Sequence, residues 1–178
     1  MTPLTFTTGD LRAASGVLQA SAAQLQARGR LLWPPESLTP ERLARHYPPH
    51  IWRVAWRGPQ AAGTFCLLES DPPFWPDDPP GEALYLHKLA VHPEAQGGGL
   101  GPALLREAVI QTRAAGRPWL KLDTAADRPA LQALYETFGF ERCGQRRVFE
   151  FEVVLYRLAV VGNAIHPEDE LPAPDKFA

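Results

Sequence analysis

The residues of this chain with the clearest chemical potential lie where a predicted strand runs into a cluster of glycines. The segment reads Leu89-Ala90-Val91-His92-Pro93-Glu94-Ala95-Gln96-Gly97-Gly98-Gly99-Leu100-Gly101. Glycines adopt positive φ angles readily and let a ligand approach the backbone without a Cβ in the way. Their amides, placed beside the positive end of a following helix, form a binding site for an anion such as a phosphate or pyrophosphate.

Two common phosphate-binding motifs do not fit this segment. No Lys-Ser or Lys-Thr pair follows the glycines, which argues against an NTP-binding P-loop. The spacing G-x-G-x-x-G is also absent, which argues against a dinucleotide-binding fold. A tight strand-to-helix turn without a ligand stays open as the structural alternative, although three successive glycines carry an entropic cost that a plain turn does not require.

Two motifs together resemble the GCN5-related N-acetyltransferase (GNAT) superfamily. The run Gln96-x-x-Gly99-x-Gly101 fits the coenzyme-A loop of that family, Gln/Arg-x-x-Gly-x-Gly/Ala, and Val91-x-Pro93 precedes it as in many members. Downstream, Leu134-Tyr135-Glu136-x-x-Gly139-Phe140 is similar to the second marker of the family, the helix before the penultimate strand. The two motifs cover about residues 83–145, in compatible order. The resemblance implies acetyl-CoA as the cofactor.

The resemblance also assigns cofactor contacts. The loop amides from Gln96 to Gly101 would hold the pyrophosphate, and backbone groups of Leu89, Ala90 and Val91 would pair with the pantetheine arm like an added strand. The chain departs from the family pattern at two places. Pro102 lacks an amide donor, and Arg128 stands where many members have Asn, so that it either contacts a cofactor phosphate or is a solvated residue at a helix start.

Acyl transfer from a thioester to an amine needs a base for the ammonium and an acid for the departing thiolate. Tyr135 occupies the family's tyrosine position and is the predicted acid; a core tyrosine is the alternative. His87 is the predicted base, because the stretch from Tyr85 to His92 is similar to the corresponding strand of arylalkylamine N-acetyltransferases. A buried strand histidine is the alternative, with a chain of waters as the base.

The acceptor site in this family is built from the first two helices and the loop before the fourth strand. Aromatic and acidic side chains there would suit a cationic amine, and a proline-stiffened loop that covers the core is the alternative. The candidate substrate-binding residues are Trp33, Glu69, Phe74 and Trp75. No metal site is expected.

The expected function is therefore acetyl-CoA-dependent N-acetyltransfer, directly and through a ternary complex, to a primary amine: a small amine, an amino acid, or a peptide N-terminus or lysine. Two alternatives stay open. One is a non-catalytic coenzyme-A-binding regulatory module, and the other is an N-acyltransferase that uses a longer acyl-CoA.

Hydrophobic periodicity predicts the elements that position these residues. Helices are expected to begin at Leu11, at Thr39-Pro40, at Gly97 and near Leu131. Strands are expected over 4–8, 51–56, 62–68, 83–91, 119–123 and 147–161, the last as one strand or a hairpin. This order predicts an α/β (α+β) fold with helices on both faces of a mixed sheet. The resemblance implies a mostly antiparallel sheet, splayed at the coenzyme-A site.

Composition limits the partners. The chain has 178 residues, 45% of them hydrophobic, which fits a single acetyltransferase domain over 1–161 with an acidic, proline-bearing tail over 162–178. A net charge of −2 gives no electrostatic support for nucleic-acid binding. No apolar window is long enough to predict a membrane span, and the two distant cysteines favour a reduced, cytoplasmic setting. A homodimer through strand 153–161 is one expectation; a core position for that strand is the other.

Overall fold

The computed structural model describes residues 2–30 and 33–160, and its centre is a seven-stranded sheet in the order β1-β2-β3-β4-β5-β7-β6. All neighbours pair antiparallel except β4 and β5, which are parallel. The strands are β1 (Leu4–Thr8), β2 (Trp52–Arg57), β3 (Gln60–Leu68), β4 (Ala83–Val91), β5 (Trp119–Ala125), β6 (Glu141–Val148) and β7 (Phe151–Ala159). The predicted fold class, a mixed and mostly antiparallel sheet, is confirmed.

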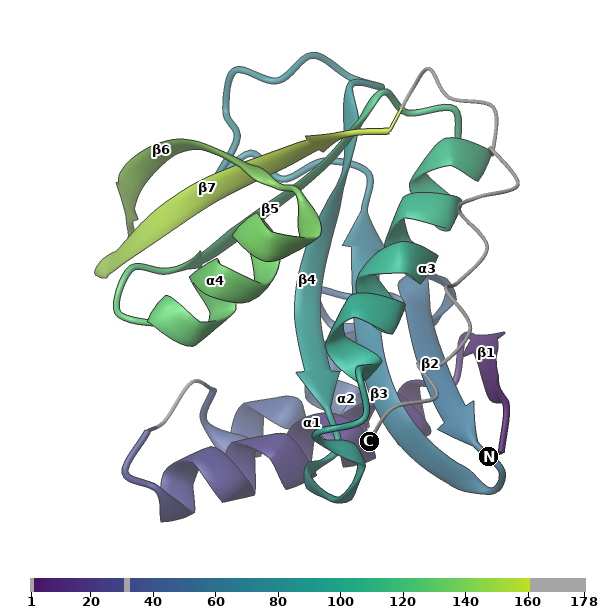
Figure 1. The fold of residues 1–178 in the computed structure, drawn as a ribbon. Coiled ribbons are helices and arrows are strands. Elements are labelled where there is room, and N and C mark those ends of the chain that lie inside the picture. The colour runs from purple at the N-terminus through teal and green to yellow at the C-terminus, as the bar shows by residue number, and fades with distance from the viewer. Residues whose placement is uncertain (1, 31–32, 161–178) are drawn as a thin grey trace, which may run out of the picture.

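Helices cover both faces of this sheet (Figure 1). The α-helices are α1 (Leu11–Ala27), α2 (Pro40–Ala44), α3 (Leu100–Ala114) and α4 (Pro129–Phe138), and the short 3-10 turns are η1 (Pro35–Leu38), η2 (Pro49–Ile51) and η3 (Pro93–Ala95). Successive residues of a strand point to opposite faces. Val54 therefore packs in the core under α1 and α2, whereas Ala55 packs in the core under α3 and α4.

The sheet opens between its two parallel strands. β4 pairs with β5 only from Ala83 to Leu86, against Trp119 to Leu122, and beyond that point the two strands diverge (Figure 1). The pairing of β4 with β3 shifts in the same region, because His87 faces Cys66 whereas Ala90 faces Thr64. Two residues of β4 thus stand opposite one residue of β3, and one of the two, Lys88, has a φ of 56°. The bulge and the splay leave residues 87–91 of β4 without strand partners on the β5 side.

Two predictions about elements need correction. Strand structure at the C-terminal end begins at Glu141 rather than Arg147; of the two alternatives for this segment the hairpin is correct, because a turn at Phe149-Glu150 divides it into β6 and β7. The exposed polar side chains of β6 hide its strand character, since only Val148 in it is buried. The second helix is shorter than expected, because it ends at Ala44 well before the Pro48-Pro49 pair.

The position of β7 also corrects the expected dimer contact. β7 lies between β5 and β6 and pairs with both, so its edges are already occupied. The edge strands of the described sheet are β1 and β6. The core alternative is therefore correct for Val153 and Val154, which are buried. Of the two cysteines, Cys66 is buried in β3 and Cys143 is exposed on β6. The predicted tail 162–178 lies outside the described residues.

Candidate active site at the sheet opening

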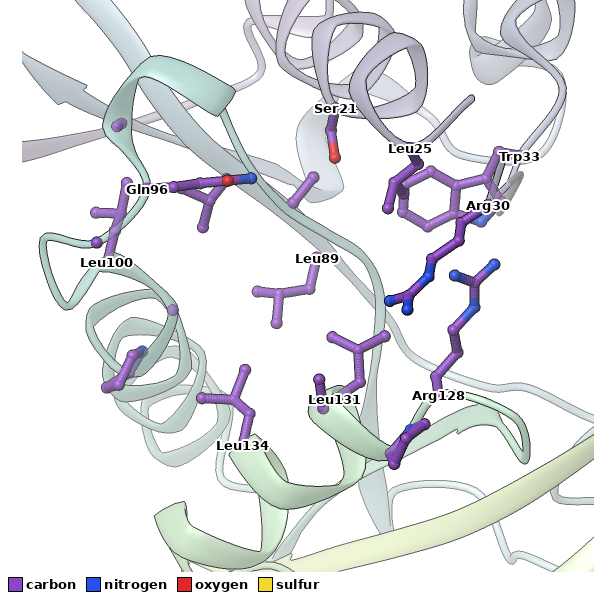
Figure 2. Close-up of a pocket in the computed structure, with 18 of the residues that line it drawn as sticks. Ser21, Leu25, Arg30, Trp33, Leu89, Gln96, Leu100, Arg128, Leu131 and Leu134 are labelled. Carbon is purple, nitrogen blue, oxygen red and sulfur yellow. The ribbon is translucent and has the colours of Figure 1, made fainter. Parts of the chain in front are cut away.

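A cavity of about 930 Å³ lies at the opening of the sheet, between the glycine turn, α4 and the end of α1 (Figure 2). This volume is within the range of cofactor sites. Its lining includes every predicted cofactor-binding residue except Gly98 and Tyr135. The lining residues from these elements are Leu89, Ala90, Val91, Gln96, Gly97, Gly99, Leu100, Gly101, Arg128, Leu131 and Leu134.

The glycine turn has the geometry of an anion site. Gly97 and Gly99 have φ angles of 80° and 68°, a region that side-chain-bearing residues adopt only at a cost. Gly99 is the N-cap of α3, and no side chain caps that helix end. The amides of Leu100 and Gly101, both of which line the cavity, therefore have no capping side chain, whereas Pro102 contributes no donor. These features fit the diphosphate of coenzyme A.

Two side chains that local sequence reasoning missed fix the turn from outside. Arg57, at the end of β2, donates from Nη2 to the carbonyl oxygen of Gly98 over 3.1 Å. A Cβ at Gly98 would lie 2.7 Å from the same Nη2, so a side chain there would displace the guanidinium. Gln96 donates from Nε2 to Oε1 of Gln24 on α1 over 2.9 Å. The turn is thereby tied to β2 and to α1.

The middle of the cavity suits the apolar part of a pantetheine arm. Leu89 lies at its centre, with Leu131 and Leu134 of α4 on the opposite wall (Figure 2). The unpaired edge of β4 beyond Leu86 supplies backbone donors and acceptors next to these leucines. An extended chain with amide groups can occupy such an edge as an added strand.

The end of the cavity away from the glycine turn carries positive charge. Arg30, just after α1, and Arg128, the N-cap residue of α4, point toward one another there, and Trp33 lies beside Arg30 (Figure 2). The predicted contact of Arg128 with a cofactor phosphate stays a prediction. Figure 2 shows Arg128 and the glycine turn on opposite sides of Leu89.

Tyr135 lies on the buried side of α4, against the rings of Phe140 and Tyr156, at centroid distances of 5.8 and 5.9 Å. Burial, with a smaller effect of the Asp123 carboxylate, raises the pKa of its phenol above the ordinary value. The phenol therefore keeps its proton at neutral pH. This is the state that a proton donor requires, although Tyr135 is packed in the core and does not itself line the cavity.

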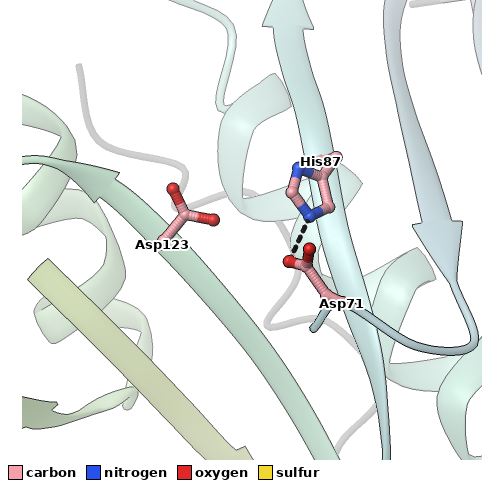
Figure 3. A group of neighbouring side chains, drawn as sticks. All are labelled: Asp71, His87 and Asp123. Atoms are coloured by element: carbon pink, nitrogen blue, oxygen red, sulfur yellow. Dashed lines mark hydrogen bonds and ion pairs between the residues drawn. The ribbon is translucent and has the colours of Figure 1, made fainter. Parts of the chain in front are cut away.

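On the face of the sheet covered by α1 and α2, three side chains meet at the opening: Asp71, His87 and Asp123 (Figure 3). Nε2 of His87 and Oδ2 of Asp71 lie 2.7 Å apart, and one ligand atom from each of the three residues lies within 4.8 Å of the others. A hydrogen bond from Nε2–H to Asp71 leaves Nδ1 as the acceptor on the ring. We name these three residues the Asp71–His87–Asp123 group.

The sequence pointed to His87 but not to the role of its two partners. Asp71 belongs to the loop between β3 and β4, where prolines hide any periodic signal, and it is only 6% exposed. Asp123 is on β5, directly across the opening from His87 (Figure 3). Burial raises the pKa of Asp123 to about 6, although His87 lowers it somewhat. The three side chains have the composition of a metal site, but the short His87–Asp71 hydrogen bond is the geometry of a proton-accepting pair.

The predicted substrate-binding residues divide into two groups. Phe74 packs against His87 at 6.0 Å between centroids, and Trp33 lines the cavity while stacking on the ammonium of Lys88 at 4.6 Å. Trp75 instead stacks on Lys121, with 4.7 Å between Nζ and the ring centre. Glu69 is exposed and forms an ion pair with Arg117 at 3.7 Å. The structure thus brings Trp33 and Phe74, but not Trp75 and Glu69, to the opening.

The comparison with protein families decides the classification. Residues 20–140, more than half of the chain, match the model of the acetyltransferase (GNAT) family. The chain belongs to the GNAT family. This confirms the resemblance drawn from the two motifs, and with it the predicted cofactor, because acetyl-CoA is the cofactor of the family. The glycine turn, the open edge of β4 and the leucine-lined cavity fit that cofactor.

Individual relatives are more distant. The chain is 33% identical to the N-alpha-acetyltransferase RimI of Mycobacterium tuberculosis over 121 residues, 65% of each protein. It is 37% identical to the uncharacterized N-acetyltransferase YesJ of Bacillus subtilis over 76 residues, 43% of this chain and 42% of that protein. The chain therefore spans less than two thirds of the length of either relative.

Solved structures confirm the fold. The ribosomal-protein-S18-alanine N-acetyltransferase from Escherichia coli superimposes with a TM-score of 0.66 at 20% identity, over 92% of this chain and 97% of that one. At this identity the similarity establishes the architecture alone. None of the helices within 2–30 and 33–160 has both the length and the hydrophobicity needed to cross a bilayer.

Proposed function

We propose that this protein is an acetyl-CoA-dependent N-acetyltransferase that moves an acetyl group directly to a primary amine within a ternary complex. One observation carries the proposal. The splay of β4 from β5 joins two dissimilar sites: the cofactor cavity, lined by the glycine turn, α4 and the end of α1, and the Asp71–His87–Asp123 group on the face covered by α1 and α2. A thioester held along β4 would present its carbonyl in this gap, with a proton acceptor on the far side.

The histidine acts as the base. An alkylammonium has a pKa of about 10, so an amine acceptor must lose a proton before it attacks. His87, oriented by Asp71 through Nε2, accepts this proton at Nδ1, directly or through a water molecule. The carboxylate of Asp123 faces the same space and holds the incoming ammonium before its deprotonation.

Transfer then proceeds by addition and collapse. The amine nitrogen forms a bond to the carbonyl carbon, and the oxyanion receives a hydrogen bond from the amide of Leu89 or Ala90 in the opened strand. Collapse would break the carbon–sulfur bond, with the phenol of Tyr135 donating a proton to the departing thiolate. The second proton of the attacking amine would then restore the phenol through solvent, and the proton taken by His87 would pass to water. No covalent enzyme intermediate is required. When bound, acetyl-CoA supplies the activated acetyl group and its thiol leaving group.

Two measurements test the proposal. Calorimetry with acetyl-CoA and with longer acyl-CoAs measures binding and chain-length preference, and release of free thiol in the presence of an amine panel measures transfer. We expect tight binding of acetyl-CoA and amine-dependent thiol release. Tight binding without transfer to any amine would instead support the non-catalytic coenzyme-A-binding module, which Pro102 and Arg128 favour as departures from the family loop.

Two further expectations belong to this proposal. A cytoplasmic location rests on the free cysteines Cys66 and Cys143. A homodimer, if it forms by strand pairing, would use β1 or β6, the edge strands of the described sheet. Size-exclusion chromatography with light scattering measures the oligomeric state.

A further inference from the structure

Lys88 is one of two non-glycine residues with a positive φ in the described part of the chain, and the other, Phe149, lies in the β6–β7 turn. Lys88 is half-buried within β4, and its φ of 56° lies in the left-handed region, which costs a non-glycine residue about 1–2 kcal/mol. The glycine-like conformation is required by the bulge that opens the sheet, yet the chain places a charged side chain there. Backbone outliers of this kind concentrate at functional sites.

The Lys88 ammonium contacts aromatic rings but no carboxylate among the described residues. Nζ lies 4.6 Å from the ring centre of Trp33 and 5.8 Å from that of Tyr47. Within residues 2–30 and 33–160, no carboxylate forms an ion pair with it. Burial lowers the pKa of this ammonium, with the Asp123 carboxylate acting in the opposite direction. An ammonium held by two aromatic faces still has hydrogen-bond donors for an anion.

The position of this cation relates it to the base. Tyr47 packs against both groups, since its ring centre lies 6.1 Å from that of His87 and 5.8 Å from Nζ of Lys88. Trp33, under the ammonium, also lines the cofactor cavity, and Arg30 lies beside it (Figure 2). The opening thus has two different sides. The Asp71–His87–Asp123 group provides carboxylates and a proton acceptor on one side, Lys88 provides a cation on the other, and the ring of Tyr47 contacts both.

We propose that Lys88 binds a carboxylate of the acceptor, so that the substrate is a small amino acid-like molecule whose amine and carboxylate lie a few bonds apart. This inference rests on the proposed function. The amine would face His87 and Asp123 while the carboxylate faces Lys88. A peptide N-terminus has no carboxylate at that position, and a simple alkylamine would leave the Lys88 ammonium without its anion.

The test compares matched ligands on the intact protein. An α-amino acid and its α-carboxamide, with the same side chain, are titrated calorimetrically in the presence of coenzyme A, and both are assayed for thiol release with acetyl-CoA. Lys88→Met removes the charge, Lys88→Arg keeps it, and Lys88→Asn removes it in a residue that tolerates positive φ. Melting curves identify any variant that does not fold.

We expect wild-type protein to prefer the carboxylate over the carboxamide by about tenfold or more in affinity, as for a charge-assisted hydrogen bond. The preference should disappear in Lys88→Met and Lys88→Asn and return at least partly in Lys88→Arg. The amines of the two ligands differ in pKa, and this difference affects the ratio of the two affinities equally in every variant. Comparing that ratio between variants therefore removes its contribution. If Lys88→Asn is the only uncharged variant that folds, it alone is compared with wild-type protein. If neither uncharged variant folds, the affinity ratio of carboxylate to carboxamide in wild-type protein tests the inference.

Other outcomes separate the alternatives. Equal affinity for both ligands in wild-type protein would overturn the inference, whereas the proposed function would stand if both are acetylated. A carboxylate preference without thiol release would support the inference and contradict the proposed function. If Lys88→Met instead weakens acetyl-CoA binding and leaves the ligand ratio unchanged, the anion is a cofactor phosphate and the inference fails.

Discussion

The two sides of the sheet opening are built in different ways. On the cofactor side, the site consists of backbone groups from one continuous segment, from Leu89 to Gly101, with apolar walls from α4. On the acceptor side, it consists of side chains from separate elements: Asp71 in a loop, His87 on β4 and Asp123 on β5. A site made from local backbone depends on conformation, and a site made from distant side chains depends on the whole topology.

This comparison leads to a first prediction about the acceptor side. Replacing His87 with Gln should lower kcat/KM for the amine by about 100-fold, the usual range for loss of a general base. The acidic limb of the pH–rate profile should change shape, whereas His46→Gln, at an exposed histidine, should leave it intact. An unaltered acidic limb in His87→Gln would exclude this residue as the base and would weaken the contrast between the two sides.

The acceptor side should also carry a cost in stability. The pKa of Asp123 is raised by burial from 3.8 to about 6, so its ionised form is less stable in the folded protein than in the unfolded chain. Wild-type protein therefore loses stability as the pH rises from about 4 to 6, and the loss persists at higher pH. Asp123→Asn should be more stable by on the order of 2 kcal/mol at pH 8.

The control for this prediction is the stability of the same two proteins at low pH. The unfolded pKa is 3.8, so only at about pH 3 or lower is the Asp123 carboxyl largely protonated in both states, and there the stabilities of the two proteins should converge. Urea unfolding at several pH values measures the difference. A constant difference across the range would mean that packing or hydrogen bonding, rather than the buried charge, determines the effect.

Tyr135 is the proposed proton donor for the thiolate, and the effect of replacing it should be smaller than that of replacing His87. Tyr135→Phe keeps the ring contacts with Phe140 and Tyr156 and removes only the hydroxyl. We expect turnover to fall by about tenfold, with little change in the affinity for acetyl-CoA measured by calorimetry. Unchanged turnover would remove Tyr135 from the mechanism and would leave it as a core residue.

The smallest expected effect concerns the backbone of the cofactor side. A methyl group at Gly99 or at Gly116 meets no atom within 4 Å, and both residues have a φ close to 70°. Alanine at either position should therefore destabilise the fold by a similar amount, about 1 kcal/mol. Only Gly99→Ala, at the N-cap of α3, should also weaken acetyl-CoA binding, by several-fold. Equal loss of affinity in both variants would mean that global stability, not the turn, is responsible.

The same contrast explains how much the sequence predicted. The glycine turn, β4 and the flanking helix were predictable because turn chemistry and periodicity are local properties. The partners of His87 were not, because Asp71 is sixteen positions before it in a proline-rich loop and Asp123 is a single polar residue in β5. The bracing of Gly98 by Arg57 depends on a tertiary contact across 41 positions and left no local signal.

The short junction between β4 and β5 has a mechanical consequence. Only four aligned residue pairs join the β1–β4 half of the sheet to the β5–β7 half. We expect such a short junction to let the gap widen and close in the free protein, and to become more rigid when an extended ligand adds hydrogen bonds along 87–91. Amide hydrogen exchange would follow this as slow, ligand-dependent protection confined to that stretch of β4.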